Sequence, residues 1–334
     1  MSNCYEKLKE DLKLNQYTWL ITGVAGFIGC NLLETLLQLD QIVIGIDNFS
    51  TGFQANLDEV LSIFPQKQQN HFKFYEGDIC SPEDCKKVMQ GVDIVLHQAA
   101  LGSVPRSIKA PELTNATNVN GFLNVLTAAK EAEVKRFVYA SSSSVYGDSQ
   151  ELPKNEEKIG NPLSPYAVSK YTNELYAKAF STCYGIKTIG LRYFNVFGPR
   201  QNPNGPYAAV IPLWVNALKE KKPVYINGDG ETTRDFCYVD NAIQANLLAA
   251  MTANSEAMNR VYNIAVNEQN TLKKLYDMIV ENLNLSNAKV IYRNFRDGDI
   301  RHSLANIDNA NRLLGYVPQY NLDDGLKKML EINK

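Results

Sequence analysis

Three glycines near the N-terminus restrict the fold of this chain more than any other feature. In Thr22-Gly-Val-Ala-Gly-Phe-Ile-Gly29 they recur at intervals of three, directly after a short apolar run and directly before an amphipathic stretch. Glycine permits a tight turn and a close approach of ligand to backbone, and the start of the helix that follows favours negative charge. The segment predicts a strand, a turn and a helix that bind the pyrophosphate of a dinucleotide, with a purely structural turn as the alternative.

Apolar runs alternate with helical patterns over the first 195 residues. The expected strands are Thr18–Ile21, Ile42–Ile46, Phe72–Tyr75, Ile94–Leu96, Phe137–Tyr139 and Thr188–Leu191. The expected helices are an N-terminal helix at 5–14, then Phe27–Leu39, Pro82–Met89, Pro111–Ala132 and Pro165–Tyr184. This alternation predicts an α/β fold with a Rossmann-type, doubly wound parallel sheet that carries helices on both faces.

The texture of the sequence changes after about residue 195. Proline and glycine become frequent, and the expected elements become shorter. We therefore expect residues 1–195 to form mainly the dinucleotide-binding domain. Residues 196–334 are expected to form mainly a smaller, mixed α/β substrate-binding lobe, with segments interleaved back into the first domain.

The composition excludes several classes of protein. The 334 residues carry 34 Lys and Arg against 36 Asp and Glu, so the net charge of −2 offers no basic surface for nucleic acid or acidic membranes. Six scattered cysteines without a C-x-x-C pair and three distant histidines argue against a disulfide framework and a zinc site. No apolar run reaches the length of a membrane span, and the N-terminus lacks a signal-peptide core. We expect a cytoplasmic, metal-free enzyme without nucleic-acid or membrane partners.

An acidic residue lies where a dinucleotide site needs one. Asp47 follows Gly29 by 18 residues, at the end of the expected strand Ile42–Ile46. Its carboxylate can accept hydrogen bonds from ribose hydroxyls and would repel a 2′-phosphate, which favours NAD over NADP. The next two strands end in Asp78-Ile79 and Gln98-Ala-Ala100, where ligands bind in parallel sheets. For the two alanines, close packing of helix on sheet is an equal explanation.

A tyrosine and a lysine mark the chemical end of the predicted site. Tyr166 and Lys170 are four residues apart in an expected helix and share one face. An ammonium group near the phenol, together with a nicotinamide cation, would lower the pKa of Tyr166 toward neutrality, as a general base requires. The spacing alone is a weak signal, because Tyr5 and Lys9 match it too. The serine run 141–144 ends the fifth expected strand, where a hydroxyl could relay a proton; a polar loop is the alternative.

Four motifs occur together in this chain. They are Thr-Gly-x-x-Gly-x-x-Gly, Ser-Ser-x-x-Val-Tyr-Gly, Tyr-x-x-x-Lys and Arg192-Tyr-Phe-Asn195. As a set, which spans nearly the whole chain, they resemble the extended short-chain dehydrogenase/reductases that act on nucleotide sugars. Segments 100–107, 225–231 and 295–303 further resemble bacterial UDP-N-acetylglucosamine 4-epimerases of surface-polysaccharide pathways. The resemblance implies that tightly bound NAD takes hydride from C4 of the sugar, that the 4-keto sugar rotates, and that hydride returns to the opposite face.

The resemblance also implies roles for individual residues. Tyr166 would remove the proton of the 4-hydroxyl, which Ser142 and Ser143 hold, while Lys170 binds the nicotinamide ribose and tunes Tyr166. The residues expected to bind NAD are Gly23, Gly26, Phe27, Ile28, Gly29, Asp47, Asn48, Ser50, Thr51, Gly52, Asp78, Ile79, Gln98, Asn118, Tyr166, Lys170 and Val196. The residues expected to bind the UDP-sugar are Gly102, Ser103, Asn195, Val210, Tyr225, Asn227, Arg234, Arg296, Asp299 and Ser303. Among the latter, Asn195 and the two arginines match positions that grip the diphosphate, although each arginine has a surface ion pair as its alternative.

A small residue implies room for an N-acetyl group. Related epimerases restricted to glucose and galactose carry a bulky aromatic residue near the 2-position of the sugar, whereas the matching residue here is Ser303, with Gly102 and Ser103 in the same pocket. Epimerisation of UDP-glucose and UDP-galactose, or of the uronic acid forms, stays open as an alternative. Phe197-Gly-Pro-Arg200 replaces the commoner Phe-Gly-Arg-Arg, so one positive charge is missing near the active-site loop.

The residues before Val145 argue against two related activities, dehydration and decarboxylation of the nucleotide sugar. Related 4,6-dehydratases carry an Asp-Glu pair there, and UDP-glucuronate decarboxylases a Glu-bearing tract, whereas this chain has Ser143 and Ser144. A non-catalytic, NAD-sensing scaffold has no use for the intact Tyr166 and Lys170. The helices expected at 111–132 and 165–184 resemble those that form a four-helix bundle in dimeric relatives, so a homodimer is expected.

Overall fold

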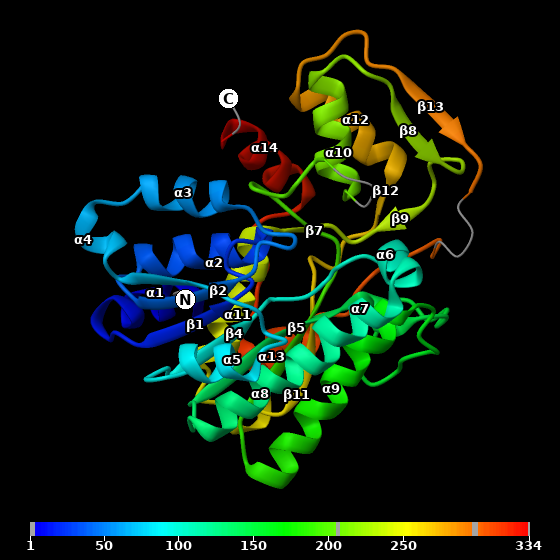
Figure 1. Ribbon diagram of the computed structural model, residues 1–334. Helices are drawn as coiled ribbons and strands as arrows, with labels where there is room; N and C mark the ends of the chain where they lie inside the picture. The colour runs from blue at the N-terminus through cyan, green and yellow to red at the C-terminus, as the bar shows by residue number, and fades with distance from the viewer. Residues whose placement is uncertain (1–3, 205–207, 296–299, 333–334) are drawn as a thin grey trace.

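A parallel sheet of seven strands forms the centre of the molecule (Figure 1). The computed structural model describes residues 4–204, 208–295 and 300–332. The strands lie in the order β11-β6-β5-β4-β1-β2-β3, and every neighbouring pair is parallel. Their bounds are β1 (Thr18–Thr22), β2 (Ile42–Asp47), β3 (Phe72–Glu76), β4 (Ile94–His97), β5 (Arg136–Ser142), β6 (Thr188–Tyr193) and β11 (Arg260–Ile264). The expected α/β class with a Rossmann-type sheet is confirmed.

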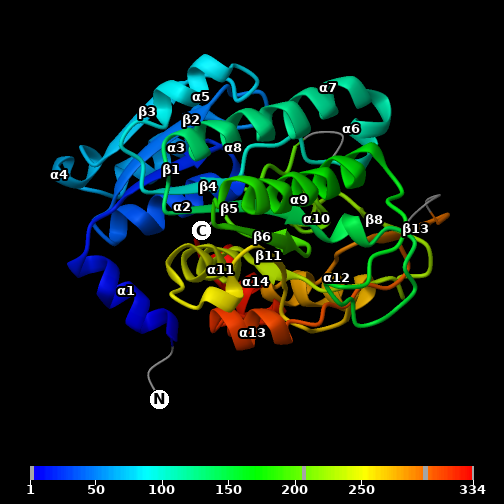
Figure 2. The same cartoon turned by 90° about the horizontal axis from the view of Figure 1, so that it is seen from below.

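Helices cover both faces of this sheet (Figure 2). One face carries α2 (Phe27–Gln38), α11 (Val239–Met251) and α13 (Asp308–Leu314). The other face carries α5 (Pro82–Val88), α8 (Phe122–Glu131) and α9 (Pro165–Tyr184). Further helices lie around this core: α1 (Cys4–Leu14), α3 (Gln54–Ser62), α4 (Gln66–Gln69), α6 (Val104–Lys109), α7 (Pro111–Asn115) and α14 (Leu322–Ile332). Parallel strands need such crossover helices, which explains the alternation in the sequence.

The elements expected from the sequence are present, with two differences. The predicted helix at 111–132 is divided into α7, a π-helical turn (Ala116–Gly121) and α8. Within that turn, Asn118 accepts a hydrogen bond from the backbone N–H of Leu101 (2.8 Å) and donates to its carbonyl oxygen (3.2 Å). The second difference is β11, which the sequence analysis did not predict, because its apolar run lies in the proline- and glycine-rich half of the chain.

The apolar core consists of two main layers, one on each face of the sheet. Alternate side chains of one strand enter opposite layers, so that Trp19 and Ile21 join one cluster and Leu20 joins the other. The indole N–H of Trp19 donates to Gln41 Oε1 (3.0 Å), which satisfies its polar atom inside the core. A fully buried apolar side chain contributes about 1.5–3 kcal/mol to the stability of the fold.

A smaller lobe adjoins the sheet-based part of the molecule (Figure 1). It contains α10 (Val210–Lys219), β8 (Val224–Asn227), β9 (Thr233–Arg234), β12 (Asn270–Thr271), α12 (Leu272–Asn282) and β13 (Val290–Arg293). Its strands pair only in twos, β8 with β13 in parallel and β9 with β12 in antiparallel. Two more short strands, β7 (Val196–Phe197) and β10 (Cys237–Tyr238), pair in parallel where the chain passes between lobe and sheet. Among residues 208–295 and 300–332, the lobe therefore contains only short two-stranded ladders.

Candidate active site

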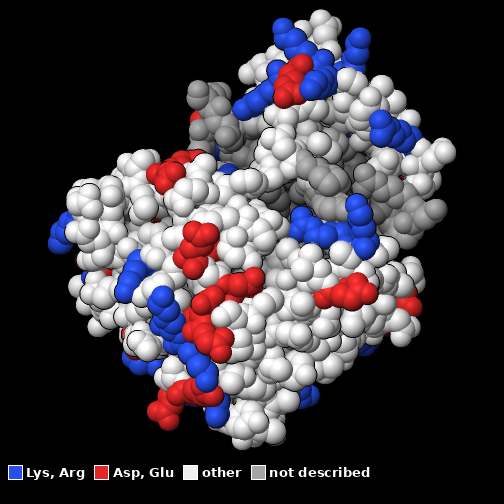
Figure 3. Space-filling view, in the orientation of Figure 1, with Lys and Arg blue, Asp and Glu red and all other residues white. Residues whose placement is uncertain are grey.

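A cleft of about 810 Å³ opens between the sheet and the lobe. On the face seen in Figure 3 the molecule is hollowed at this boundary, and Lys and Arg side chains gather beside the hollow. The predicted NAD-binding residues that line the cleft are Gly23, Gly26, Phe27, Ile28, Gly29, Asp47, Asn48, Ser50, Thr51, Asp78, Ile79, Gln98, Tyr166, Lys170 and Val196. The predicted catalytic and substrate-binding residues that line it are Ser142, Gly102, Ser103 and Asn195. A volume of this size lies within the range of small-molecule sites.

The glycine turn makes a cradle that no larger residue could form. Gly23 has φ +73°, and a Cβ there would lie 2.8 Å from the backbone of Ala99. A Cβ on Gly29 would lie 2.1 Å from the carbonyl oxygen of Gly23. The turn is held by a hydrogen bond from the Gly23 N–H to the carbonyl oxygen of Ile46 (2.8 Å). The first turn of α2 thus faces the cleft with free space for a pyrophosphate beside its N–H groups.

Asp47 ends β2 at the floor of this cleft. Its two carboxylate oxygens accept hydrogen bonds from the backbone N–H groups of Ala25 and Phe49, each at 2.9 Å. Burial raises the pKa of Asp47, and these N–H groups oppose the rise because they stabilise the ionised form. Next to it, Asn48 donates to Asp78 Oδ2 (3.0 Å), so the ends of β2 and β3 are tied together. The acidic residue predicted for the ribose therefore also organises the loop after β2.

Tyr166 and Ser142, two of the predicted catalytic residues, line the same cleft. Ser164 caps α9 by accepting a hydrogen bond from the N–H of Ala167 (3.1 Å), and Pro165 is the first residue of the helix. Tyr166 therefore lies in the first turn of α9. Burial raises the pKa of the Tyr166 phenol, and a hydrogen bond with Ser142 opposes that rise. The lowered pKa expected from the sequence requires the nicotinamide cation as well; the protein groups alone raise the pKa, because burial disfavours the phenolate.

Lys170 lies one helical turn further along α9 and is buried. Its ammonium group donates to the carbonyl oxygen of Ala140 (2.8 Å), near the end of β5. Burial lowers the pKa of Lys170 to about 8, and Glu174 opposes the shift. Glu174 accepts a bidentate pair from Arg192 (2.7 and 2.9 Å) and a hydrogen bond from Ser141 (2.5 Å). Sequence reasoning missed this buried network, which places the negative charge of Glu174 near Lys170.

A second hydrogen-bonded group links Gln98 after β4, Tyr193 at the end of β6 and Asn246 on α11. Gln98 donates to Asn246 Oδ1 (3.0 Å) and accepts from the hydroxyl of Tyr193 (3.2 Å). Asn246 in turn donates to the Tyr193 oxygen (2.7 Å), which closes a triangle. Gln98 was predicted from its place at the end of a strand, whereas Tyr193 was seen only as part of a family motif. The triangle holds both side chains that line the cleft in one orientation.

Three of the residues predicted for the cofactor or for catalysis lie outside the lining of the cleft. Gly52 packs on the glycine turn, where a Cβ would lie 2.8 Å from the carbonyl carbon of Ala25. Asn118 is buried and bonded to the backbone of Leu101 and to Ser169 (3.1 Å), so it supports the cleft from behind. Ser143 begins the short 3₁₀ turn Ser143–Tyr146 and does not reach the cleft. These positions shape the site without facing it.

The predicted sugar-nucleotide residues on the lobe fall into two groups. Tyr225 and Asn227 lie on β8, where the guanidinium of Arg293 covers the Tyr225 ring at 3.4 Å from its centroid. Arg234 and Ser303 lie on neighbouring segments, because Thr233 N–H donates to the carbonyl oxygen of Arg301 (3.0 Å). With Val210 at the start of α10, these residues do not line the cleft. Arg296 and Asp299 lie outside the described residues.

Several polar residues that line the cleft were not predicted. Arg106 projects from α6 within the segment that begins at Gly102, and Thr117 lies on the π-helical turn. One segment after Arg200 adds the amides of Gln201, Asn202 and Asn204, together with the small residues Ala208 and Ala209. Its amide-rich composition beside Gly198 and Pro199 was the available signal. A loop of that kind carries no periodic pattern, so its position relative to the sheet could not be read from the sequence.

A parallel sheet with a glycine cradle, an acid after β2 and a Tyr–Lys pair on α9 defines a dinucleotide-dependent enzyme. The chain matches the model of the family described as "NAD dependent epimerase/dehydratase family" over residues 19–265. It belongs to this family, and its cofactor is NAD. At Gly23 and Gly29 a Cβ would collide with the chain's own backbone, so only glycine allows the tight turn that a dinucleotide cradle needs.

Relatives of known name extend over almost the whole chain. A putative UDP-glucose 4-epimerase of Methanocaldococcus jannaschii is 34% identical over 93% of this chain and 96% of its own length. A UDP-glucuronate 4-epimerase of Thermodesulfobacterium geofontis is 32% identical over 95% of this chain and 96% of its own. Among solved structures, a UDP-N-acetylglucosamine 4-epimerase from Methanobrevibacter ruminantium M1, in complex with UDP-N-acetylmuramic acid, is 35% identical with a TM-score of 0.87, covering 95% of this chain and 98% of that one.

Proposed function

We propose that this protein is a UDP-sugar 4-epimerase that interconverts UDP-N-acetylglucosamine and UDP-N-acetylgalactosamine with tightly bound NAD. The observation that carries the proposal is that Tyr166, Ser142 and Lys170 line one cleft, where Lys170 donates from α9 to the carbonyl oxygen of Ala140 (2.8 Å) near the end of β5. Relatives named as 4-epimerases of UDP-glucose, UDP-glucuronate and UDP-N-acetylglucosamine support the reaction type.

In the proposed reaction Tyr166 takes the proton of the sugar's 4-hydroxyl, and Ser142 holds that hydroxyl. When bound, NAD supplies a reversible acceptor for the hydride of C4. The glycine turn and Asp47 hold the cofactor. Lys170, on the same helix as Tyr166, binds the nicotinamide ribose. The sugar turns within the cleft between the two halves of the cycle, and Tyr166 returns the proton. Because proton and hydride both return to the substrate, no group is lost.

The charge of the bound cofactor completes the base. Burial raises the pKa of Tyr166 in the protein alone, so its side chain there is a neutral phenol at physiological pH. The positive nicotinamide ring, together with Lys170, supplies the positive charge that favours phenolate. This arrangement links activity to the presence of cofactor, since the protein without it lacks a tuned base.

Room for an N-acetyl group supports the choice of substrate. Gly102 and Ser103 line the cleft, and a Cβ on Gly102 would meet no atom within 4 Å. Ser303 is small and lies beside β9, next to the segment that carries Arg234. In this proposal these three residues border the 2-position of the sugar. Plain UDP-glucose and UDP-galactose, or the uronic acid forms, are the alternative substrates.

Loss of water or carbon dioxide is disfavoured by the residues after β5. Ser144 donates to Ser142 Oγ (2.8 Å) and so supports the catalytic serine. Neither Ser143 nor Ser144 can act as the acid that a 4,6-dehydratase or a decarboxylase needs. Epimerisation, which expels nothing, requires no such acid.

Proton NMR of the purified protein with UDP-N-acetylglucosamine, and without added NAD, tests the proposal. We expect a new anomeric signal of UDP-N-acetylgalactosamine that rises to a steady ratio. Conversion of only UDP-glucose or UDP-glucuronate would keep the mechanism and overturn the role of Ser303. No conversion of any of these sugars after NAD is supplied would favour a non-catalytic NAD-binding scaffold.

We also propose that the enzyme is a cytoplasmic homodimer. Exposed apolar side chains of Leu113 on α7 and of Val168 and Leu175 on α9 form an apolar face, and these two helices pack together. Burial of this face against a second copy is the expected contact. None of the helices in the described ranges is long and apolar enough to span a bilayer. Light scattering after gel filtration distinguishes the dimer from a monomer.

A further inference from the structure

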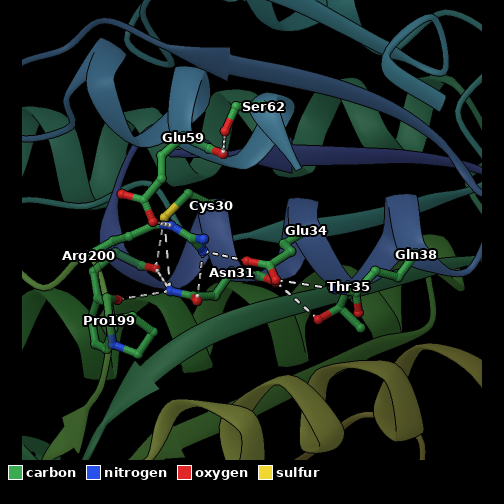
Figure 4. A network of polar contacts seen from close by, with 10 residues as sticks. Cys30, Asn31, Glu34, Thr35, Gln38, Glu59, Ser62, Pro199 and Arg200 are labelled. Atoms are coloured by element: carbon green, nitrogen blue, oxygen red, sulfur yellow. Dashed lines mark hydrogen bonds and ion pairs between the residues drawn. The ribbon is translucent and has the colours of Figure 1, made fainter. Parts of the chain in front are cut away.

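Arg200 is the centre of a polar network that joins the cleft loop to the NAD-binding half (Figure 4). Its guanidinium pairs with Glu34 of α2 (2.6 Å) and with Glu59 of α3 (2.8 Å), and it donates to Asn31 Oδ1 (3.1 Å). The amide of Asn31 in turn donates to the carbonyl oxygen of Pro199 (3.2 Å). The Arg200 side chain thus connects its own loop to α2 and to α3. The bond from Asn31 to Pro199 attaches the backbone of the same loop to α2.

Because the Arg200 side chain is buried, its charge depends on each of these contacts for stabilisation. The side chain of Arg200 is only 5% exposed, against 25% for Glu34 and 54% for Glu59. A charge removed from water needs partners with good geometry, and the planar guanidinium fork meets two carboxylates and an amide at once. A lysine ammonium has no such fork, so it would lose part of this set. Glu34, the more buried carboxylate, should contribute more than Glu59.

The backbone around Arg200 is held in a conformation that it would not adopt freely. Arg200 has φ +64° and Asn195 has φ +35°, both in the left-handed region that side chains disfavour. Such a conformation costs about 1–2 kcal/mol per residue and persists only where surrounding contacts hold it. The Arg200 network supplies those contacts at one end of the segment. Gln201 Nε2 donates to the carbonyl oxygen of Val196 (3.1 Å) and closes the loop between them.

Both sides of the anchored point line the cleft, although Arg200 itself does not. Asn195 and Val196 precede it, and Gln201, Asn202 and Asn204 follow it. The helices that carry its partners adjoin the cofactor-binding part of the cleft. Helix α2 begins at the glycine turn, and α3 follows the segment 48–53, most of which lines the cleft. A movement of the loop therefore displaces residues of the sugar side relative to residues of the cofactor side.

We propose that Arg200 is a positioning residue that ties the loop Asn195–Asn204 to α2 and α3, so that binding of NAD and of the UDP-sugar support each other. The inference rests on the proposed function and adds to it the residue that couples the two ligands. Without the anchor the loop spends less time in its binding-competent position, and apparent affinity falls by that fraction. Chemistry at Tyr166 is unaffected once both ligands are bound, since Arg200 does not face the reacting atoms.

The test compares Arg200→Met, Arg200→Lys and Glu34→Gln with the wild type. For Arg200→Met we expect a rise of about 10-fold in the Kd for UDP, measured by calorimetry on the NAD-loaded protein. We expect faster release of NAD by a similar factor, a matching rise in KM for UDP-N-acetylglucosamine, and a kcat within about 2-fold of the wild type. Arg200→Lys should lie between the two, and Glu34→Gln should repeat part of the effect without being additive to Arg200→Met.

Lys328→Met is the matched control, because it removes an interhelical ion pair with Asp240 (2.6 Å) away from the cleft. It should lower the Tm and leave the Kd for UDP and the release of NAD unchanged. If Arg200→Met behaves like this control, or lowers kcat at constant KM, the proposal is overturned. Should Arg200→Met fail to fold, Arg200→Lys and Glu34→Gln decide by the same criteria. A wild type that binds UDP but converts no UDP-sugar would refute the proposed function while the UDP and NAD measurements still judge Arg200.

Discussion

The two sides of the cleft are built by different means. On the cofactor side, the glycine turn and Asp47 are fixed by backbone hydrogen bonds at the ends of long parallel strands, such as that from Gly23 to Ile46 (2.8 Å). On the sugar side, the strands pair only in twos, and side chains do the holding. Asp235 accepts hydrogen bonds from the N–H groups of Val266, Asn267 and Ala305 at 3.0–3.2 Å.

This difference separates a rigid cofactor-binding part of the site from a part whose segments can move or be exchanged. A backbone cradle on a seven-stranded sheet is rigid, and it suits the binding of one cofactor, NAD. Segments held by single side chains can move or be exchanged at lower cost, which suits the part of the site that selects a sugar. The predictions below probe each side with changes that the other side should tolerate.

Loss of the phenolic oxygen of Tyr166 should have the largest effect. In Tyr166→Phe, turnover should fall by about 10³-fold, because general base catalysis contributes a factor of this size, while NAD stays bound. Turnover is followed by NMR, and NAD is measured in the denatured protein. Tyr5→Phe is the control, since Tyr5 has the same spacing to a lysine in α1 and should leave turnover unchanged. Activity within tenfold of the wild type in Tyr166→Phe would refute the assignment.

A methyl group should be rejected on the cofactor side and accepted on the sugar side. Gly29→Ala places a Cβ 2.1 Å from the Gly23 carbonyl oxygen, whereas a Cβ on Gly102 meets nothing within 4 Å. We expect Gly29→Ala to weaken NAD binding by about 100-fold, since the backbone must move to relieve the clash. Gly102→Ala should retain NAD and the wild-type Tm. Equal NAD content in the two purified variants would contradict the rigid cradle.

Asp235 predicts a pH dependence of stability on the sugar side. Burial raises its pKa from 3.8 to about 6, against the opposing N–H groups of Val266 and Ala305. The folded state then binds the proton more tightly than the unfolded state, so stability from this group is full below about pH 4 and is lost as the pH rises through about 6. The loss is about 3 kcal/mol. The unfolding free energy in urea, relative to Asp235→Asn, should fall by this amount from pH 4 to 7; a constant difference would refute it.

A larger residue at position 303 should change selectivity by the smallest factor. Ser303→Tyr should lower kcat/KM for UDP-N-acetylglucosamine by about 10-fold relative to UDP-glucose, because the aromatic ring fills the space proposed for the acetamido group. Ser303→Ala keeps that space open and should leave the ratio unchanged. The ratio comes from competition between the two sugars in one NMR experiment. An unaltered ratio in Ser303→Tyr would show that the acetamido group does not bind beside residue 303.

The sequence predicted the strands of the central sheet more completely than the elements of the lobe. The six expected strands are present, because side-chain alternation and glycine spacing are local properties. The seventh strand, β11, comes from the later half of the chain, where short elements carry weak patterns. The π-helical turn at Asn118 was also missed, since the partners of that side chain, Leu101 and Ser169, lie in other elements.

The sequence by itself determined the glycine turn, the acid at Asp47 and the shared helical face of Tyr166 and Lys170. Each of these depends on residues that are neighbours in the chain, so local spacing is sufficient. Only the tertiary structure decided that Glu174 and Arg192 pair behind Lys170, and that Arg200 meets Glu59, which is 141 positions away. Such contacts depend on how whole elements pack, because burial brings distant charges together and then requires them to be paired.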